Sequence, residues 1–274
     1  MTTPTRTRSL RTRLLAVVTD ATSRLTAAWS ILTTAQERLL AALSRIRPGR
    51  GATSAIRAAV AAFQRSLAMF DAAVAAFAER WASVDLPLVY REGALTMVER
   101  ADRSTSRWTW TTRHQQAITS LTAQYYVDLM GRIREALRRA RAFLRAAQDA
   151  ARGTSFDADQ LRADHPLGTV IYANDHRHPV HAWARAALSW QTVSTANAGG
   201  ARTALDDMGA QFLEVNDSPD CGWTEHNDPD RANLTVRTIA DALAHPLSHA
   251  NCVREFLPRL DLTGRTDIES GARL

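Results

Sequence analysis

Eight large apolar residues recur in alternating steps of four and three positions along one segment of the chain. They are Ile56, Val60, Phe63, Leu67, Phe70, Val74, Phe77 and Trp81. This spacing places side chains along a single seam of an α-helix. The pattern therefore predicts one long helix over about 54–83 that must pack its seam against a partner. Either the first helix of the chain or a second copy of the chain can provide that partner.

The rest of the first half also follows a helical pattern. Apolar residues with arginines between them predict a helix over 9–46, which Arg47-Pro-Gly-Arg-Gly ends. Asp85-Leu-Pro-Leu is expected to interrupt the seam helix, with a short helix following near Val89–Arg100. A further long helix is predicted over about 112–151.

After Gly153 the long helical patterns give way to shorter predicted elements. The stretch from Thr169 to Val180 predicts a β-hairpin with Asn174-Asp175 as its turn. Beyond it we expect one or two helices from His181 to about Leu205, interrupted near Ala198-Gly-Gly. The remaining elements expected are a strand at 211–216 and a short helix near Val236–Ala244.

These patterns predict an α+β chain that is mainly helical, with a long-helix N-terminal half followed by a small α+β C-terminal domain. We place a basic long-helix domain at 1–153, the α+β domain with its cysteines at 154–259, and a flexible tail at 260–274. No long uninterrupted apolar run and no secretory signal are evident in the sequence. Synthesis in the cytoplasm, without membrane contact, is the expectation.

All 34 basic residues are arginine, and their distribution is uneven. Residues 1–153 hold 24 arginines against 11 acidic residues, whereas 154–274 hold 10 against 17. The net charge of +6 thus hides a basic front half and an acidic back half. Such polarity indicates two functional surfaces.

Six arginines follow one another on the faces of the helix predicted at 112–151 that its apolar stripe leaves free. They are Arg132, Arg134, Arg138, Arg139, Arg141 and Arg145. A ladder of guanidinium groups can track a phosphate backbone. It can equally bind an acidic protein or remain a solvated face.

Both cysteines lie in one segment that is also rich in histidine. Cys221 and His226 are followed about two dozen residues later by His249 and Cys252. These four residues form a Cys2His2 set at spacings that a tetrahedral metal site can use, and Zn²⁺ in a structural role is the first candidate. His245 and Asp220 are rival ligands. The alternative is a metal-free domain with a buried cysteine and capping histidines.

Catalytic motifs are not evident. The sequence contains no Gly-x-Ser-x-Gly, no phosphate-cradling glycine loop and no His-Glu-x-x-His. The acidic run from Asp217 to Asp230 lacks the spacing of an EF-hand and is interpreted as a solvated loop. We do not expect an enzyme.

Two stretches of the back half carry a further pattern. The first runs Glu214-Val-Asn-Asp-Ser-Pro-Asp-Cys-Gly-Trp-Thr-Glu-His-Asn-Asp. The second runs Pro246-Leu-Ser-His-Ala-Asn-Cys-Val-Arg-Glu-Phe-Leu-Pro-Arg. Both resemble the Mu F-like minor head proteins of tailed bacteriophages, in the form found in phages of high-GC actinobacteria. The family pattern has Cys-Gly-x-Cys near the start and His-Pro-Asn-Cys-Arg-Cys at the end. Two of its four cysteines are missing here, and Arg254 stands at the last position.

The resemblance implies a structural minor capsid protein inside the phage head, acting in head assembly or in DNA packaging and delivery. Its implied partners are the portal protein or the inner capsid, and packaged DNA. The chain itself adds self-association through the 56–81 seam as an expectation. The alternative function is a DNA-binding or ejected effector that acts on nucleic acid, and an enzyme fold with hidden catalytic residues ranks behind both.

Overall fold

A computed structural model describes residues 9–45, 53–152, 157–172 and 175–274, and it is mainly helical with small antiparallel sheets, which confirms the α+β class. The described residues form two compact units. The first, here the Cys/His unit, comprises residues 9–20, Trp81–Tyr125 and Arg185–Leu274. The second, here the helical unit, comprises Ala21–Arg80 and Tyr126–Ala184. These units divide the chain differently from the predicted domains 1–153 and 154–259, whose boundaries stay a prediction.

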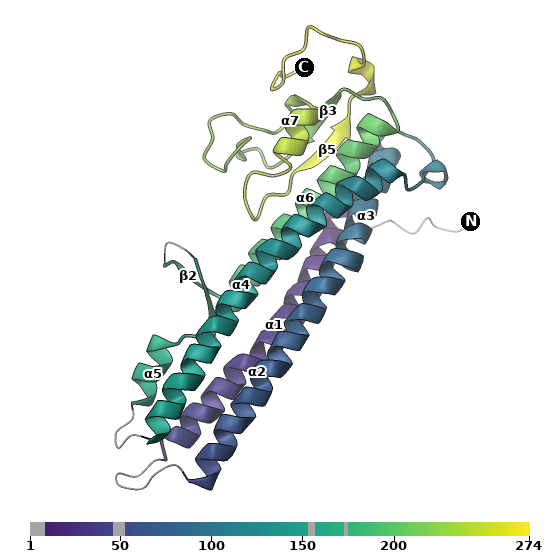
Figure 1. Cartoon of the computed structure of the whole chain (residues 1–274). Coiled ribbons are helices and arrows are strands. Elements are labelled where there is room, and N and C mark those ends of the chain that lie inside the picture. Colours follow the sequence, from purple (N-terminus) through teal and green to yellow (C-terminus); the bar gives the residue numbers. More distant parts are fainter. Residues whose placement is uncertain (1–8, 46–52, 153–156, 173–174) are drawn as a thin grey trace, which may run out of the picture. The chain divides into compact units, whose positions relative to one another are not determined.

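The helical unit is built around parts of three long helices, α1 (Leu10–Leu43), α2 (Ser54–Arg80) and α4 (Thr112–Arg152). Within the unit these helices lie side by side (Figure 1). The seam of α2 faces both neighbours. Phe70 packs edge-on against Trp29 of α1 at a ring distance of 5.2 Å, and Phe63 packs against Phe143 of α4 at 5.1 Å.

The seam is therefore covered within one chain. Its buried members on α2 are Ile56, Phe63, Phe70, Val74 and Phe77. Of the two predicted partners, the first helix of the chain is the one observed, together with α4. Self-association through the 56–81 seam would require this packing to open.

The hairpin predicted at 169–180 is present in the helical unit. Its strands β1 (Thr169–Ile171) and β2 (Arg177–Pro179) pair antiparallel. Asn174, in the predicted turn, lies outside the described residues, as do the predicted breaks at 47–51 and Gly153. The unit also contains the short helix α5 (Ala158–Asp164).

The expected interruption at Asp85-Leu-Pro-Leu is a change of helical winding instead of a break. α2 is followed directly by a π-helical turn, Trp81–Asp85, and then by α3 (Leu86–Arg100). Pro87 stands in the first positions of α3. A proline lacks an N–H and clashes with the carbonyl four residues earlier, so a locally wider turn accommodates it without ending the helix.

Helix α6 (Val180–Asp206) runs without interruption through Gly199 and Gly200, so the expected break near Ala198 was wrong. In the Cys/His unit these glycines let α6 approach α3 closely. A Cβ added at Gly199 would lie 2.1 Å from the Tyr90 carbonyl oxygen, and one at Gly93 would lie 1.9 Å from the Ala196 carbonyl oxygen. Only glycine permits two backbones to come this near.

A three-stranded antiparallel sheet completes the Cys/His unit. Strand β3 (Phe212–Asn216) lies between β4 (Val236–Thr238) and β5 (Glu255–Pro258). The predicted strand at 211–216 is thus confirmed, whereas the helix expected over 236–244 is divided into β4 and α7 (Ile239–Ala244). The sheet contributes Leu213, Val215 and Phe256 to a core that also includes Ala201 and Ala204 of α6.

Residues 260–274, predicted as a flexible tail, make defined contacts in this unit. A short 3₁₀ helix covers Leu260–Leu262, and Leu262 packs against Phe212 and Val236. The Val236 backbone N–H donates to the Ala272 carbonyl at 2.8 Å, and the Gly271 N–H donates to the Val236 carbonyl at 2.7 Å. The end of the chain thus adds a bridge to the edge of β4.

One helical stretch of the described residues, Ser54–Arg100, is long and apolar enough to cross a membrane by length and composition alone. Its most apolar window has a mean hydropathy of 1.3 and is 22% buried. This stretch is not the uninterrupted apolar run that the sequence analysis considered, because Arg57, Arg65, Asp71 and Glu79 lie within it. Core helices pass the same test of length and composition, and the absence of membrane contact stays a prediction.

The close approach of α3 and α6 makes Gly93 sensitive to a single added methyl group. We expect Gly93→Ala to lower the free energy of unfolding by more than about 2 kcal/mol, because its Cβ would overlap a backbone carbonyl. Urea unfolding followed by circular dichroism measures the change.

Gly131→Ala is the matched control. Gly131 is also helical, but no atom outside its own helix surroundings lies within 4 Å of an added Cβ. The alanine should stabilise α4 by about 0.5–1 kcal/mol. Equal effects at the two glycines would contradict the role assigned to Gly93.

Candidate metal centre

The pairing of β3 with β5 brings the two cysteine-bearing segments together. The strands are antiparallel, and Asn216 at the end of β3 is opposite Glu255 at the start of β5. The chain leaving β3 and the chain entering β5 therefore meet at one edge of the sheet. Cys221 follows β3 by five residues, and Cys252 precedes β5 by three. Sequence separation alone could not show this meeting.

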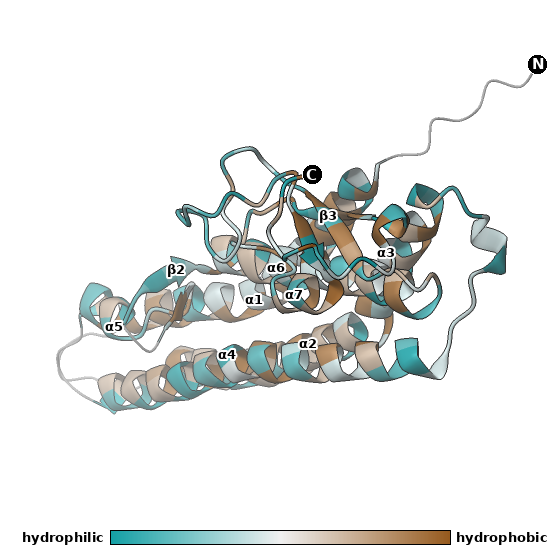
Figure 2. Cartoon of the chain, turned by 90° about the horizontal axis from the view of Figure 1, so that it is seen from above, coloured by the Kyte–Doolittle hydropathy of each residue, from teal (hydrophilic) through white to brown (hydrophobic). Residues whose placement is uncertain are grey.

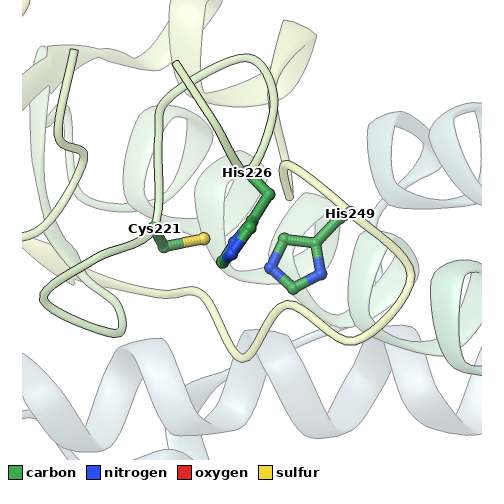
Figure 3. Close-up of side chains that lie close together, drawn as sticks. All are labelled: Cys221, His226 and His249. Atoms are coloured by element: carbon green, nitrogen blue, oxygen red, sulfur yellow. The ribbon is translucent and has the colours of Figure 1, made fainter. Parts of the chain in front are cut away.

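Three of the four residues predicted as ligands form one grouping at this edge, and the fourth, Cys252, is grouped with Cys221 but not with the two histidines. The Sγ atoms of Cys221 and Cys252 lie 3.8 Å apart, and both thiols are free and buried. One potential ligand atom from each of Cys221, His226 and His249 lies within 4.8 Å of the others. Figure 3 shows these three side chains converging, and the two imidazole rings are 4.8 Å apart at their centroids. This grouping can hold a metal ion.

A second grouping adds a carboxylate. Asp217, Cys221 and Cys252 also place ligand atoms within 4.8 Å of one another, and all three are buried. Cys221 belongs to both groupings. From the sequence, Asp217 was assigned to a solvated acidic run, since nothing in its spacing indicated that the side chain turns inward.

The geometry of the thiol pair agrees with a shared tetrahedral ion. Two thiolates bound to one zinc at about 2.3 Å each, at a tetrahedral angle, lie about 3.8 Å apart. The observed Sγ–Sγ distance is 3.8 Å. Soft sulfur and borderline imidazole donors are the set that zinc prefers, whereas Ca²⁺ and Mg²⁺ prefer oxygen.

The protonation tendencies of the cluster bear on metal binding. Burial raises the pKa of the Cys221 thiol to about 11, against the opposing hydrogen bond of Ser248. Burial and the neighbouring His226 ring lower the pKa of His249, which keeps that imidazole neutral and able to act as a ligand. A metal ion could thus bind the neutral imidazole of His249 directly, but it would have to displace the proton of the Cys221 thiol.

A hollow of about 610 Å³ opens on the cluster within the Cys/His unit. Cys221, His226, His249 and Cys252 all contribute to its lining, together with Arg11 of α1. The hollow gives an ion a path to the ligands, which a fully enclosed thiol pair would lack.

A buried arginine organises the walls of the site. Arg254 is fully buried, and its Nε donates to Oδ2 of Asp217 at 3.0 Å. Its two terminal nitrogens donate to the backbone carbonyls of Gly222, Trp223 and His245 at 2.7–3.0 Å. A buried guanidinium needs this full set of partners to offset the loss of its hydration.

Trp223 and Arg254 contact each other. The Arg254 guanidinium carbon lies over the Trp223 ring at 4.4 Å from the centroid. Arg254, which stands where the resembled pattern has its last cysteine, is thus stacked on an aromatic ring. The pairing was not evident in the sequence, where the two residues are 31 positions apart.

The two rival ligands have other roles. His245 lies against the Trp223 ring at 5.4 Å, and its Nδ1 is 2.9 Å from Oδ1 of Asp241. Asp220 belongs to neither grouping, although its backbone carbonyl accepts from Arg231.

The acidic loop is organised by its own hydrogen bonds. Asp228 accepts from the backbone N–H and the hydroxyl of Thr224. These bonds, together with one from the Asp230 N–H, lower the pKa of Asp228 to about 2. Arg237 in turn donates hydrogen bonds to both carboxylate oxygens of Asp230. The loop thus has a defined form, while Asp220, Glu225 and Asp230 remain exposed as the sequence predicted.

The six arginines predicted as a contact surface separate into two groups. Arg139 binds both carboxylate oxygens of Glu135 and donates to two carbonyls at the start of the hairpin. Arg132 donates to the Ile171 carbonyl and lies over the Tyr172 ring at 4.3 Å. These two arginines hold the hairpin to α4.

The remaining four, Arg134, Arg138, Arg141 and Arg145, are exposed.

No protein-family model, curated protein or solved structure matches this chain.

The bonds of Arg254 predict that lysine cannot replace it. A lysine keeps the charge but lacks the planar fork that reaches three carbonyls and a carboxylate. Arg254→Lys should therefore lower the free energy of unfolding by about 2–4 kcal/mol, since it leaves buried carbonyls without donors. Chemical denaturation of the full chain measures the loss.

Arg231→Lys provides the comparison. Arg231 is exposed, and its side chain donates to a single carbonyl, that of Asp220. Its replacement should change stability by less than about 0.5 kcal/mol. A similar small loss at Arg254 would show that its hydrogen bonds do not organise the unit.

Proposed function

We propose that this chain is a structural minor capsid protein inside a tailed-phage head. In this role it contacts the portal protein or the inner shell and acts in head assembly or in DNA packaging and delivery. It has no catalytic role, and after synthesis in the host cytoplasm it becomes part of the virion.

One observation carries the proposal: the two stretches that resemble the family close around a single site. Their cysteines are 31 positions apart in the sequence, yet their sulfur atoms are 3.8 Å apart. The two stretches also contact each other through Arg254, which lies over Trp223. This meeting of the two stretches supports the proposal.

The site is proposed to hold a structural Zn²⁺ through Cys221, His226, His249 and Cys252. The ion would tie the loop after β3 to the loop before β5, at the edge where the two strands meet. Such sites stabilise small units whose apolar cores are limited. When bound, zinc would supply cohesion, and no substrate step is assigned to it.

Elemental analysis of the purified full chain tests the zinc proposal. We expect about one zinc per chain, together with a rise in the thermal unfolding midpoint when zinc is restored to chelated protein. The double variant Cys221→Ser, Cys252→Ser should lose both the zinc and the rise.

His245→Gln is the control for that measurement. His245 is near the site but belongs to neither ligand grouping, so this variant should retain its zinc. Metal-free protein whose unfolding midpoint is insensitive to zinc would contradict the site.

Location within a virion tests the structural role itself. We expect quantitative mass spectrometry of purified phage particles to find the chain at low copy number, comparable to the portal protein. It should also co-purify with portal rings when the two are expressed together. A chain that is absent from particles but present in infected cells would overturn the proposal and favour the effector alternative.

A further inference from the structure

Four of the arginines on α4 form one exposed line. Arg134, Arg138, Arg141 and Arg145 follow one another in steps of four, three and four. These steps return to the same side of an α-helix. All four residues are exposed. We call this line the arginine stripe.

The stripe lacks the partners that other arginines of this helix have. Arg139 forms an ion pair with Glu135, and a terminal nitrogen of Arg152 lies 3.2 Å from Oδ1 of Asp149. Among the contacts of the described residues, no carboxylate or carbonyl receives a bond from the four side chains of the stripe. Their charge is therefore available to a partner outside the chain.

We propose that the arginine stripe binds the phosphate backbone of double-stranded DNA. This assignment deepens the proposed function and rests on it for the source of the DNA, which would be the packaged genome. It also narrows the six arginines expected from the sequence to four, because Arg132 and Arg139 are engaged with the hairpin.

The dimensions of the stripe suit this ligand. Arg134 and Arg145 are eleven positions apart, which is about 16 Å along a helix. One strand of duplex DNA carries a phosphate about every 3.4 Å along its axis, so the stripe spans about four or five phosphates. Each guanidinium can form a paired hydrogen bond with phosphate oxygens.

The opposite side of α4 holds the stripe in place. Ile133, Ala136, Ala140, Phe143 and Ala147 are almost fully buried in the helical unit. Figure 2 shows hydrophilic and hydrophobic residues alternating along α4. The stripe is thus carried on a helix that packing has already ordered, and binding need not order the backbone.

The composition of the stripe favours DNA over an acidic protein. The cores of protein–protein interfaces are depleted in charged residues and rich in apolar anchors. The stripe contains only arginines, and Gly131, the position that continues it toward the start of α4, has no side chain to serve as an anchor. Charge without an apolar core is typical of contact with a phosphate backbone.

Fluorescence anisotropy with a labelled mixed-sequence DNA duplex, over a series of salt concentrations, tests the proposal on the full chain. Loss of four phosphate contacts should reduce the slope of log affinity against log salt by about 3.6. The test variant is Arg134→Gln, Arg138→Gln, Arg141→Gln, Arg145→Gln. Glutamine is a good helix former, so we expect helicity by circular dichroism and the unfolding midpoint to be retained.

The matched control removes the same charge elsewhere: Arg38→Gln, Arg57→Gln, Arg65→Gln, Arg91→Gln. These arginines are exposed on other helices, and the slope should change by less than 1. Equal reductions of the salt slope in the two variants would overturn the proposal for the arginine stripe, because DNA binding would then depend on the total charge of the chain. Equal binding of a poly-glutamate chain and the duplex would overturn the assignment to DNA.

The outcome is separable from that of the proposed function. A test variant that enters particles at normal copy number but binds the duplex weakly supports both proposals. A full chain that enters particles and does not bind the duplex leaves the structural role intact and overturns the stripe. A chain that binds the duplex through the stripe but is absent from particles overturns the structural role alone.

Discussion

The buried pair of Arg254 and Asp217 is the interaction on which the Cys/His unit most depends. Asp217 directly follows β3, and Arg254 directly precedes β5. Their ion pair at 3.0 Å thus joins the two segments at the same edge where the strands meet. The carbonyls that Arg254 also binds belong to the loops carrying Cys221 and His249, so the cluster takes its form from this arginine. A charge that is fully buried tolerates no partial set of partners, which makes the local structure specific.

This dependence bears on the proposed metal site. Further thiols would have strengthened such a site, whereas here a cation stacked on an aromatic ring lies beside it. The stack and its hydrogen bonds provide cohesion that does not require an ion. The proposed zinc would then add to a framework that Arg254 already organises, instead of being the only connection between the loops.

The sequence predicted long helices well and short elements poorly, for physical reasons. The 56–81 seam and the α4 pattern repeat over many turns, and such periods are hard to produce by chance. Strands β4 and β5 have three and four residues, too few for alternation to stand out. The glycines of α6 suggested a break because local propensity cannot show a neighbouring helix at close approach. The inward turn of Asp217 depends on a partner 37 positions away, which no local pattern contains.

The register of β3 and β5 also limits the lengths of the chain segments around the cluster. Residues 217–221 and 249–254 each have to span a fixed gap between a strand end and the cluster, so adding one residue to either would move a ligand away. The segment 230–236 is tied to the same framework, because the Ala232 N–H donates to the Cys221 carbonyl and Asn233 Oδ1 accepts from the Asp217 N–H. Proteins with this site should therefore share three short segments of constant length.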